Sequence, residues 1–342
     1  MRERSRNSRK KQGEIMNKRI LKVGFAALTA AALTLGITGC APEKKLTIAF
    51  VMGAESDPFF QAMKVGAEAE ALALGVDLVW QGDPSAYDVA TQVPIVDNVL
   101  AQSPDGLVLI PTDPTGLQAS ADKAVAAGVA VALVDTTIND TSNAIITITG
   151  DNADGGAKAA DAIAEAIGYE DGKTYKVVIG LTSATATTNV GRQNGFEERV
   201  ASTYPGIQIV DVAYSAANPQ TANSNVNNWL TKYPDLAGIF AIDGTNASGA
   251  AAALQAKGLT GKIALVGYDA YPANVELIKS GVFTALIAQD PAAEARLAIQ
   301  TLVAYIKTGT KPSVKDVVIP NVTLNANTSE EDFAKYTYVA IN

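Results

Sequence analysis

Aspartate residues recur directly after short apolar runs in this chain, a placement that can gather side chains around a small ligand. Asp57 stands in the stretch SDPFF after the run LTIAFV, and Asp135 follows VAVALV. Asp243 and Asp269 follow two further runs, LAGIFAI and KIALVGY. One carboxylate can accept hydrogen bonds from two hydroxyl groups at once. The repeated placement therefore predicts a site for a small molecule that carries several hydroxyl groups.

Aromatic and amide side chains stand in similar positions and could complete such a site. Phe59 and Phe60 follow Asp57, Tyr214 ends the run IQIVDVAY, and Gln289 follows the run FTALIA. Aromatic rings pack on the C–H face of a sugar ring, and an amide both donates and accepts hydrogen bonds. Arg192, in GRQNGF, is the expected donor because arginine donates in a fixed fork.

Each of these residues also has a structural interpretation. Asp57 precedes Pro58, as a helix N-cap precedes a proline at the first helical position. The other aspartates could cap loops or turns, and Arg192 could be a solvated charge at a helix end. Phe59 and Phe60 could both be core residues, but adjacent helical residues point about 100° apart. At least one ring is therefore expected to face the ligand.

The composition excludes several kinds of active site. The 342 residues include no histidine, which removes Ser-His-Asp and Cys-His nucleophilic sites and every zinc site that uses imidazole. Neither a GxxxxGK[ST] loop nor a GxGxxG motif occurs, so no nucleotide cofactor is indicated. We predict a binding protein without cofactor or metal rather than an enzyme. A sugar-processing enzyme that uses aspartate pairs remains an alternative.

Short β-type runs alternate with longer helical stretches from Leu46 onward, beginning with a helix near 58–74 and ending with the run VVIP near 317–320. This alternation is typical of βαβ units in parallel sheets covered on both faces. The predicted fold class is α/β, with two doubly wound parallel-sheet lobes. Ligands bind outside the carboxyl ends of the strands in such sheets, where the residues above are placed. The polar stretch TSATATT (182–188) is interpreted as a flexible loop without a role.

The first 40 residues differ in kind from the rest. Residues 16–39 combine a basic start with an apolar run, which predicts a secretory signal peptide over 1–39, and residues 1–15 are interpreted as an upstream misassigned start. The ending ITGC resembles a bacterial lipobox, in which Cys40 is lipidated, and 40–45 would be a linker. A signal peptide with a chance cysteine is the alternative, although Cys40 is the only cysteine.

The charge distribution supports an exported body. Residues 1–39 hold nine of the 27 Lys and Arg and two of the 35 Asp and Glu. The remainder therefore has 18 basic against 33 acidic residues, a net charge of −15. Such an acidic body argues against nucleic acid or an anionic membrane surface as a partner.

Several motifs in order resemble those of one family over roughly residues 45–325: SDPFF, PTD, VD, GDNADGG, RQNGF, GYDAYP and IAQDP. The chain is similar to periplasmic sugar-binding proteins of the ribose/galactose-binding class, the receptors of ABC importers. The resemblance implies a type I periplasmic binding protein, a monomer whose two lobes are joined by a three-crossing hinge. It implies capture of a monosaccharide and delivery to an ABC permease, and the lipobox fits the extracytoplasmic form of such receptors that is anchored to the cell membrane by a lipid.

The resemblance also implies domain bounds and ligand contacts. Lobe one would comprise 45–148 plus 289–319, and lobe two 149–288 plus 320–342. The implied ligand-binding residues are Asp57, Phe59, Phe60, Asp135, Arg192, Tyr214, Asp243, Asp269 and Gln289.

The sequence departs from the ribose-binding pattern at positions that such proteins use. Ribose-binding members typically carry Asn where this chain has Asp57 and Asp243, Asn where it has Ile110, and Arg where it has Thr136. These departures imply a ligand richer in hydrogen-bond donors: another aldose, a polyol or a cationic solute. A receptor that also feeds a sensor, and a regulator of the lactose-repressor class, are further alternatives. The signal peptide and the acidic body argue against the regulator.

Overall fold

Two six-stranded sheets organise residues 44–339, the part of the chain that the computed structural model describes. The strand order is β11-β5-β4-β3-β1-β2 in the first sheet and β12-β10-β9-β8-β6-β7 in the second. The strands are β1 (Thr47–Ala54), β2 (Asp77–Asp83), β3 (Gly106–Leu109), β4 (Ala130–Val134), β5 (Ile146–Gly150), β6 (Tyr175–Leu181), β7 (Ile207–Tyr214), β8 (Leu236–Ala241), β9 (Ala264–Tyr268), β10 (Ala285–Ala288), β11 (Asp316–Ile319) and β12 (Val322–Asn325).

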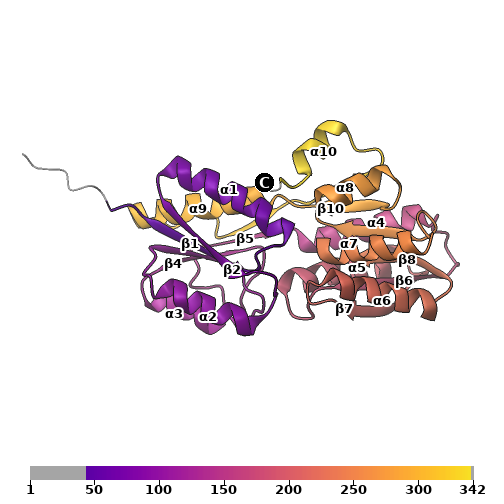
Figure 1. Ribbon diagram of the computed structural model, residues 1–342, viewed down its shortest axis with the longest axis horizontal. Helices are drawn as coiled ribbons and strands as arrows, with labels where there is room; N and C mark the ends of the chain where they lie inside the picture. Colours follow the sequence, from indigo (N-terminus) through magenta and orange to yellow (C-terminus); the bar gives the residue numbers. More distant parts are fainter. Residues whose placement is uncertain (1–43, 340–342) are drawn as a thin grey trace, which may run out of the picture. The chain divides into compact units, whose positions relative to one another are not determined.

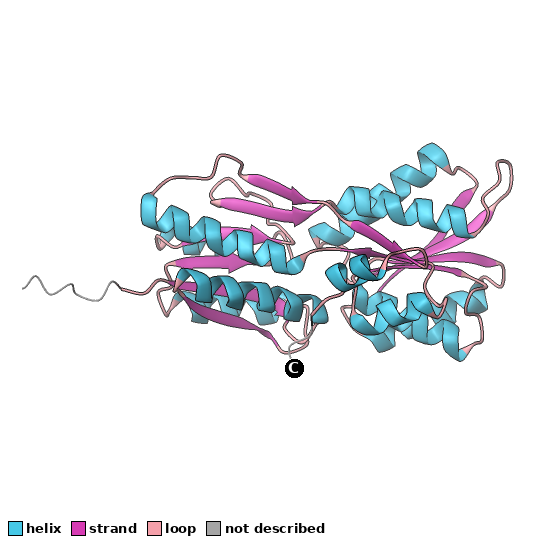
Figure 2. Cartoon of the chain, turned by 90° about the horizontal axis from the view of Figure 1, so that it is seen from above, coloured by secondary structure: helices cyan, strands magenta, loops and turns pink. Residues whose placement is uncertain are grey.

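Helices flank both sheets (Figures 1 and 2). The first sheet and its helices form the first lobe, whose helices are α1 (Pro58–Leu74), α2 (Val89–Leu100), α3 (Gln118–Ala126) and α9 (Pro291–Thr308). The second sheet and its helices form the second lobe, whose helices are α4 (Asn152–Ala166), α5 (Thr187–Thr203), α6 (Pro219–Lys232), α7 (Gly244–Ala256), α8 (Pro272–Lys279) and α10 (Glu330–Tyr336). Figure 1 shows α1 and α9 on one side of the first sheet and α2 and α3 on the other.

Successive side chains of each strand point to opposite faces of the sheet, and the apolar side chains on both faces are buried beneath helices. On β1, Phe50 and Met52 join the cluster beneath α1 and α9, whereas Ala49 and Val51 join the cluster beneath α2 and α3. Continuous apolar strands of this kind are typical of parallel sheets covered by helices. The predicted α/β class with two covered sheets is therefore what the structure contains.

One edge of the second sheet departs from the parallel arrangement that we predicted. Strand β12 pairs antiparallel with β10, with Ala288 opposite Val322. We predicted no strand or helix after residue 320, so neither β12 nor α10 was expected. A strand of four residues directly after another strand lacks the intervening helix that marks a βαβ unit.

The chain passes between the two lobes three times: after β5, after β10 and after β11. Helix α9 returns to the first lobe after the second passage and packs against α1. These passages place the carboxyl ends of β5 and β10 close to one another, at the region where the site lies.

Each lobe contains one tryptophan. Trp80, on β2, stacks on Phe50 with ring centroids 5.1 Å apart, and Trp229, on α6, is buried. Both rings therefore serve packing.

Three predictions concern residues outside the described part of the chain: the signal peptide, the misassigned start over residues 1–15, and the lipidation of Cys40. Within residues 44–339, no helix has the length and apolar character needed to span a membrane.

Candidate ligand-binding pocket

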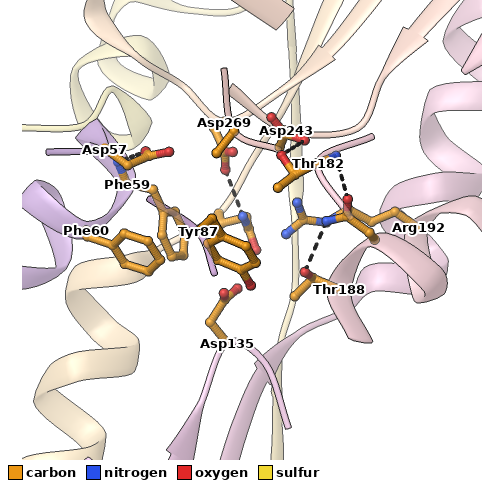
Figure 3. A pocket seen from close by; sticks show the side chains of 13 residues that line it. Asp57, Phe59, Phe60, Tyr87, Asp135, Thr182, Thr188, Arg192, Asp243 and Asp269 are labelled. Atoms are coloured by element: carbon orange, nitrogen blue, oxygen red, sulfur yellow. Dashed lines mark hydrogen bonds between the residues drawn. The ribbon is translucent and has the colours of Figure 1, made fainter. Parts of the chain in front are cut away.

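A pocket lies between the lobes, with about 460 Å³ of space between protein atoms when the part open to solvent is included. The first lobe contributes side chains from the turns after β1, β2 and β4 and from the start of α1. The second lobe contributes side chains from the turns after β6, β7, β8 and β9 and from α5, and Gln289 follows β10. The lining residues are Asp57, Phe59, Phe60, Tyr87, Asp135, Thr182, Thr188, Asn189, Arg192, Ala217, Asp243, Asp269 and Gln289. Figure 3 shows Asp57, Phe59 and Phe60 facing Arg192 and Thr188 across this space.

The structure brings every predicted site residue to this pocket except Tyr214. The Tyr214 side chain is 48% exposed and lies outside the lining. The physical reason is its place at the end of β7, the outermost strand of its sheet. The chain turns inward only after Tyr214, so that Ala217 reaches the pocket instead.

Two of the aspartates cap helices and line the pocket at the same time. Asp57 accepts a hydrogen bond from Phe59 N at 2.8 Å at the start of α1, and Asp243 accepts one from Asn246 N at 2.9 Å at the start of α7. A carboxylate at such a turn satisfies a free N–H group of the first helical turn. The two interpretations from the sequence, cap and pocket residue, are therefore compatible.

Asp135 and Asp269 occupy equivalent places in the two lobes. They follow β4 and β9, and their φ angles are 61° and 67°, in the left-handed region that non-glycine residues rarely adopt. Each backbone N–H group donates to the neighbouring strand, to Ile148 O and Ile287 O respectively, at 2.9 Å. This geometry turns both carboxylates toward the pocket.

The two carboxylates differ in what they already bind. Asp269 accepts from Gln289 Nε2 at 2.7 Å, Tyr338 Oη at 2.9 Å and Gly244 N at 2.9 Å. No hydrogen bond from residues 44–339 reaches the Asp135 carboxylate, although its side chain is buried. Asp135 therefore has its acceptor positions open to a ligand.

Arg192 is buried and held in one orientation, which overturns its interpretation as a solvated charge. Its Nε donates to Asn152 Oδ1 at 2.8 Å, its Nη1 donates to Ile242 O at 3.0 Å, and the guanidinium lies 3.8 Å from the Tyr268 ring centroid. These bonds leave further guanidinium N–H groups free to donate into the pocket.

Acidic groups outnumber basic groups in the lining, with four aspartates and a single arginine. Burial raises the pKa of Asp57 to about 7 against the opposing hydrogen bond from Tyr271. Burial also raises the pKa of Asp135 to about 7, although the charge of Arg192 acts in the opposite direction. Burial also raises the pKa of Asp243. A ligand that donates hydrogen bonds is favoured in such a pocket.

Both phenylalanines of SDPFF are buried and both line the pocket. Their rings meet edge to face with centroids 5.4 Å apart, and Phe59 is 6% and Phe60 4% exposed. The two interpretations of these rings, core and ligand platform, therefore describe the same position.

Five lining residues were not among the site residues predicted from the sequence. Tyr87 follows β2 by four residues, and the rule that the carboxyl ends of strands carry the site could have found it. Thr182, Thr188 and Asn189 belong to or adjoin the stretch that we interpreted as a loop without a role. That interpretation is wrong, because Thr182 Oγ1 donates to Asp243 at 2.9 Å and Asn189 Oδ1 accepts from Thr182 N at 2.8 Å. Ala217 carries no chemical signal in the sequence.

Comparison with known proteins identifies the family. The model of the family described as periplasmic binding protein domain matches residues 48–311. The chain belongs to the periplasmic binding protein family. The prediction of a binding receptor rather than an enzyme is thereby confirmed, as is the type I fold.

Individual members of the periplasmic binding protein family are similar over most of the chain. The D-apiose import binding protein of Paraburkholderia graminis is 30% identical over 315 residues, which cover 90% of this chain and 96% of that protein. The D-ribose/D-allose-binding protein of Pseudomonas aeruginosa is 25% identical over 312 residues, with 89% and 96% covered.

Solved structures of such receptors superpose on this one. An ABC transporter solute-binding protein from Agrobacterium vitis with bound α-D-tagatopyranose has a TM-score of 0.81 at 30% identity, covering 86% of this chain and 100% of its own. A carbohydrate transporter solute-binding protein from Agrobacterium radiobacter in complex with D-arabinose also has a TM-score of 0.81, at 27% identity, with 86% and 99% covered.

Proposed function

We propose that this protein captures a monosaccharide in the pocket between its lobes and delivers it to an ABC permease. The observation that carries the proposal is the buried Asp135 carboxylate, which has open acceptor positions and shares the pocket with Arg192 and the rings of Phe59 and Phe60. Vicinal hydroxyls would donate to Asp135, Arg192 would donate to a ligand oxygen, and the rings would pack on the apolar face.

The remaining lining carboxylates would accept one further hydroxyl each. An ionised carboxylate offers about four lone-pair positions, and protein donors occupy three at Asp269. Gln289 Oε1 is buried and has no hydrogen-bond partner within residues 44–339. Acceptors thus dominate the pocket, which favours a ligand with many hydroxyl donors: a monosaccharide first and a polyol second.

Anchoring at the outer face of the cytoplasmic membrane is part of the proposal. The lipobox-like ITGC, with Cys40 as its last residue, supports a lipoprotein whose signal peptide is removed. The lipid would tether the receptor near the permease without inserting the acidic body into the membrane. We propose a monomer, and coupling to a sensor is a further role that the same pocket would permit.

A thermal-shift screen followed by calorimetry tests the ligand class. D-arabinose, D-tagatose, D-allose and D-ribose would be compared with polyols of the same carbon number. A ligand at about 100 times its Kd stabilises the folded protein by roughly 2.7 kcal/mol, which gives a measurable rise in Tm. We expect at least one monosaccharide to raise the Tm, and no response to any sugar or polyol would contradict the proposal. Consumption of the ligand would instead indicate an enzyme.

A further inference from the structure

One pocket carboxylate accepts hydrogen bonds from both lobes. Asp57, in the first lobe, uses Oδ1 to accept from Phe59 N of its own turn and from the hydroxyl of Tyr271 in the second lobe. Its Oδ2 accepts from Thr245 Oγ1, also in the second lobe, at 3.3 Å. The lobes are therefore joined at Asp57 by direct bonds that involve no ligand.

Tyr271 is fixed by its surroundings in the second lobe. Its ring lies over Gly244, where a Cβ atom would come within 2.2 Å of it, and is 7% exposed. Tyr338 lies beside it, with ring centroids 6.0 Å apart. The Tyr338 hydroxyl donates to Asp269 Oδ1 at 2.9 Å, and its backbone N–H donates to Ala270 O at 2.9 Å. The Tyr271 hydroxyl is thus held where Asp57 meets it.

Apolar packing passes between the lobes at the same place. The Tyr338 ring meets the edge of Phe59, of the first lobe, with centroids 6.0 Å apart. Phe59, Tyr271 and Tyr338 belong to one continuous hydrophobic cluster that includes core residues of both lobes. The contact at Asp57 is therefore a packed junction between the lobes and not an isolated polar contact.

We propose that Tyr271 is a closure residue, whose hydroxyl bonds to Asp57 when the lobes come together and so stabilises the ligand-bound form. The inference rests on the proposed function, because closure matters for a ligand held between the lobes. A bond present only in the closed form shifts the population toward that form. Asp57 then serves recognition indirectly as well, since Tyr271 and Thr245 occupy acceptor positions that a ligand would otherwise use.

The test compares Tyr271→Phe with a matched control, Tyr204→Phe. Tyr204 also donates to an aspartate, Asp161 Oδ1 at 2.9 Å, but both residues lie in the second lobe away from the pocket. Tyr271→Phe keeps the ring and removes the bond between the lobes. We expect its affinity for D-arabinose, or for whichever sugar of the panel binds, to fall about tenfold, the loss expected for one hydrogen bond between the lobes. Tyr204→Phe should bind as the wild type does.

Small-angle X-ray scattering supplies a readout that needs no ligand. We expect Tyr271→Phe to have a larger radius of gyration than the wild type, both without sugar and at saturating sugar. The radius of gyration of Thr245→Ala should also increase, but by less. Equal radii in both conditions together with equal affinity would overturn the proposal. If no sugar binds the wild type, the proposed function fails, and the ligand-free radius alone decides: an increase supports the closure role and an unchanged radius overturns it.

Discussion

At the scale of single residues, Arg192 combines charge and geometry in a way that a lysine cannot reproduce. Its guanidinium bonds to Asn152 and Ile242 O and covers the Tyr268 ring, so its remaining N–H groups point in fixed directions. It is also the one cationic side chain of the lining, among four aspartates. The proposed recognition of the ligand and the charge balance of the pocket therefore both depend on Arg192.

We expect Arg192→Lys to weaken sugar binding by tenfold or more and to lower the ligand-free Tm only slightly. The ammonium group keeps the positive charge among the aspartates but loses the planar fork. Titration calorimetry and a thermal melt measure the two effects. The control is Arg199→Lys, because Arg199 pairs with Asp161 at 2.8 Å on the partly exposed surface of the second lobe. Equal affinities for the two variants would contradict the role of Arg192.

The raised pKa values of Asp57 and Asp135 predict a dependence of stability on pH. Each pKa is about 7 in the folded protein, against about 3.9 in an unfolded chain. The folded form therefore holds protons that the unfolded form releases, and this contribution to stability is present below pH about 4 and lost as the pH rises through about 7. The ligand-free Tm should fall between pH 5 and pH 8.

The double variant Asp57→Asn/Asp135→Asn should flatten this dependence. Asp83→Asn is the control, because hydrogen bonds from Ser85 and Ala86 N–H lower the pKa of Asp83 and it stays ionised throughout that range. Melting curves at pH 5, 6, 7 and 8 provide the comparison. A wild-type Tm that rises over this interval would show that neither aspartate holds a proton in the folded protein.

At the scale of elements, the close approach of α4 and α5 positions Arg192. A Cβ atom at Gly156 would lie 2.0 Å from Arg192 O, and one at Gly195 would lie 2.0 Å from Ala153 O. Glycine at both positions lets the two helix backbones meet. Asn152, at the start of α4, can then reach the Arg192 side chain.

Gly156→Ala should separate these helices and destabilise the protein by about 2 kcal/mol or more, within the range for overpacked cores. The measurement is urea unfolding without ligand, with sugar affinity as a second readout because Arg192 would shift. Ala166→Ser, at an exposed position at the end of the same helix, is the control and should leave both unchanged. Unchanged stability of Gly156→Ala would mean that the helices can part without cost.

Most elements could be predicted from the sequence, because apolar runs and helix signals agree along the chain. The predicted helix over 58–74 coincides with α1, which begins after the cap Asp57 and ends at Gly75 with φ 67°. Strand β12 has no such signal, because its four residues follow β11 without the intervening helix that marks a βαβ unit. For the site, strand-end aspartates were predictable. Tyr271 and Tyr338 were not, because their partners Asp57 and Asp269 come from distant segments.

At the scale of the whole molecule, the proposed membrane location of the receptor rests on the N-terminal region. Residues 1–39 carry nine basic and two acidic residues, whereas the rest of the chain is acidic. The proposed lipid anchor at Cys40 would hold the pocket close to a permease, so that captured ligand need not diffuse through the surrounding medium.

We expect Cys40→Ser to release the protein from the membrane fraction of expressing cells while leaving sugar binding intact. The serine cannot receive the thioether-linked lipid, and residue 40 precedes the described fold that begins at residue 44. Fractionation with an immunoblot measures release, and intact mass measures the lipid. Ala41→Ser, at the next position, is the matched control. Equal membrane retention of Cys40→Ser and the wild type would exclude a lipid on this cysteine.

Because each lobe contains one tryptophan, the fluorescence of each lobe can be followed separately. Trp80 stacks on Phe50 beneath the first sheet, and Trp229 is buried in the second lobe. Neither ring lines the pocket, so fluorescence from a Trp80→Phe or Trp229→Phe variant would report the unfolding of a single lobe. Denaturation curves of the two variants should coincide, because three chain passages and a shared hydrophobic cluster couple the lobes. The chain thus carries its own pair of internal probes for cooperative folding.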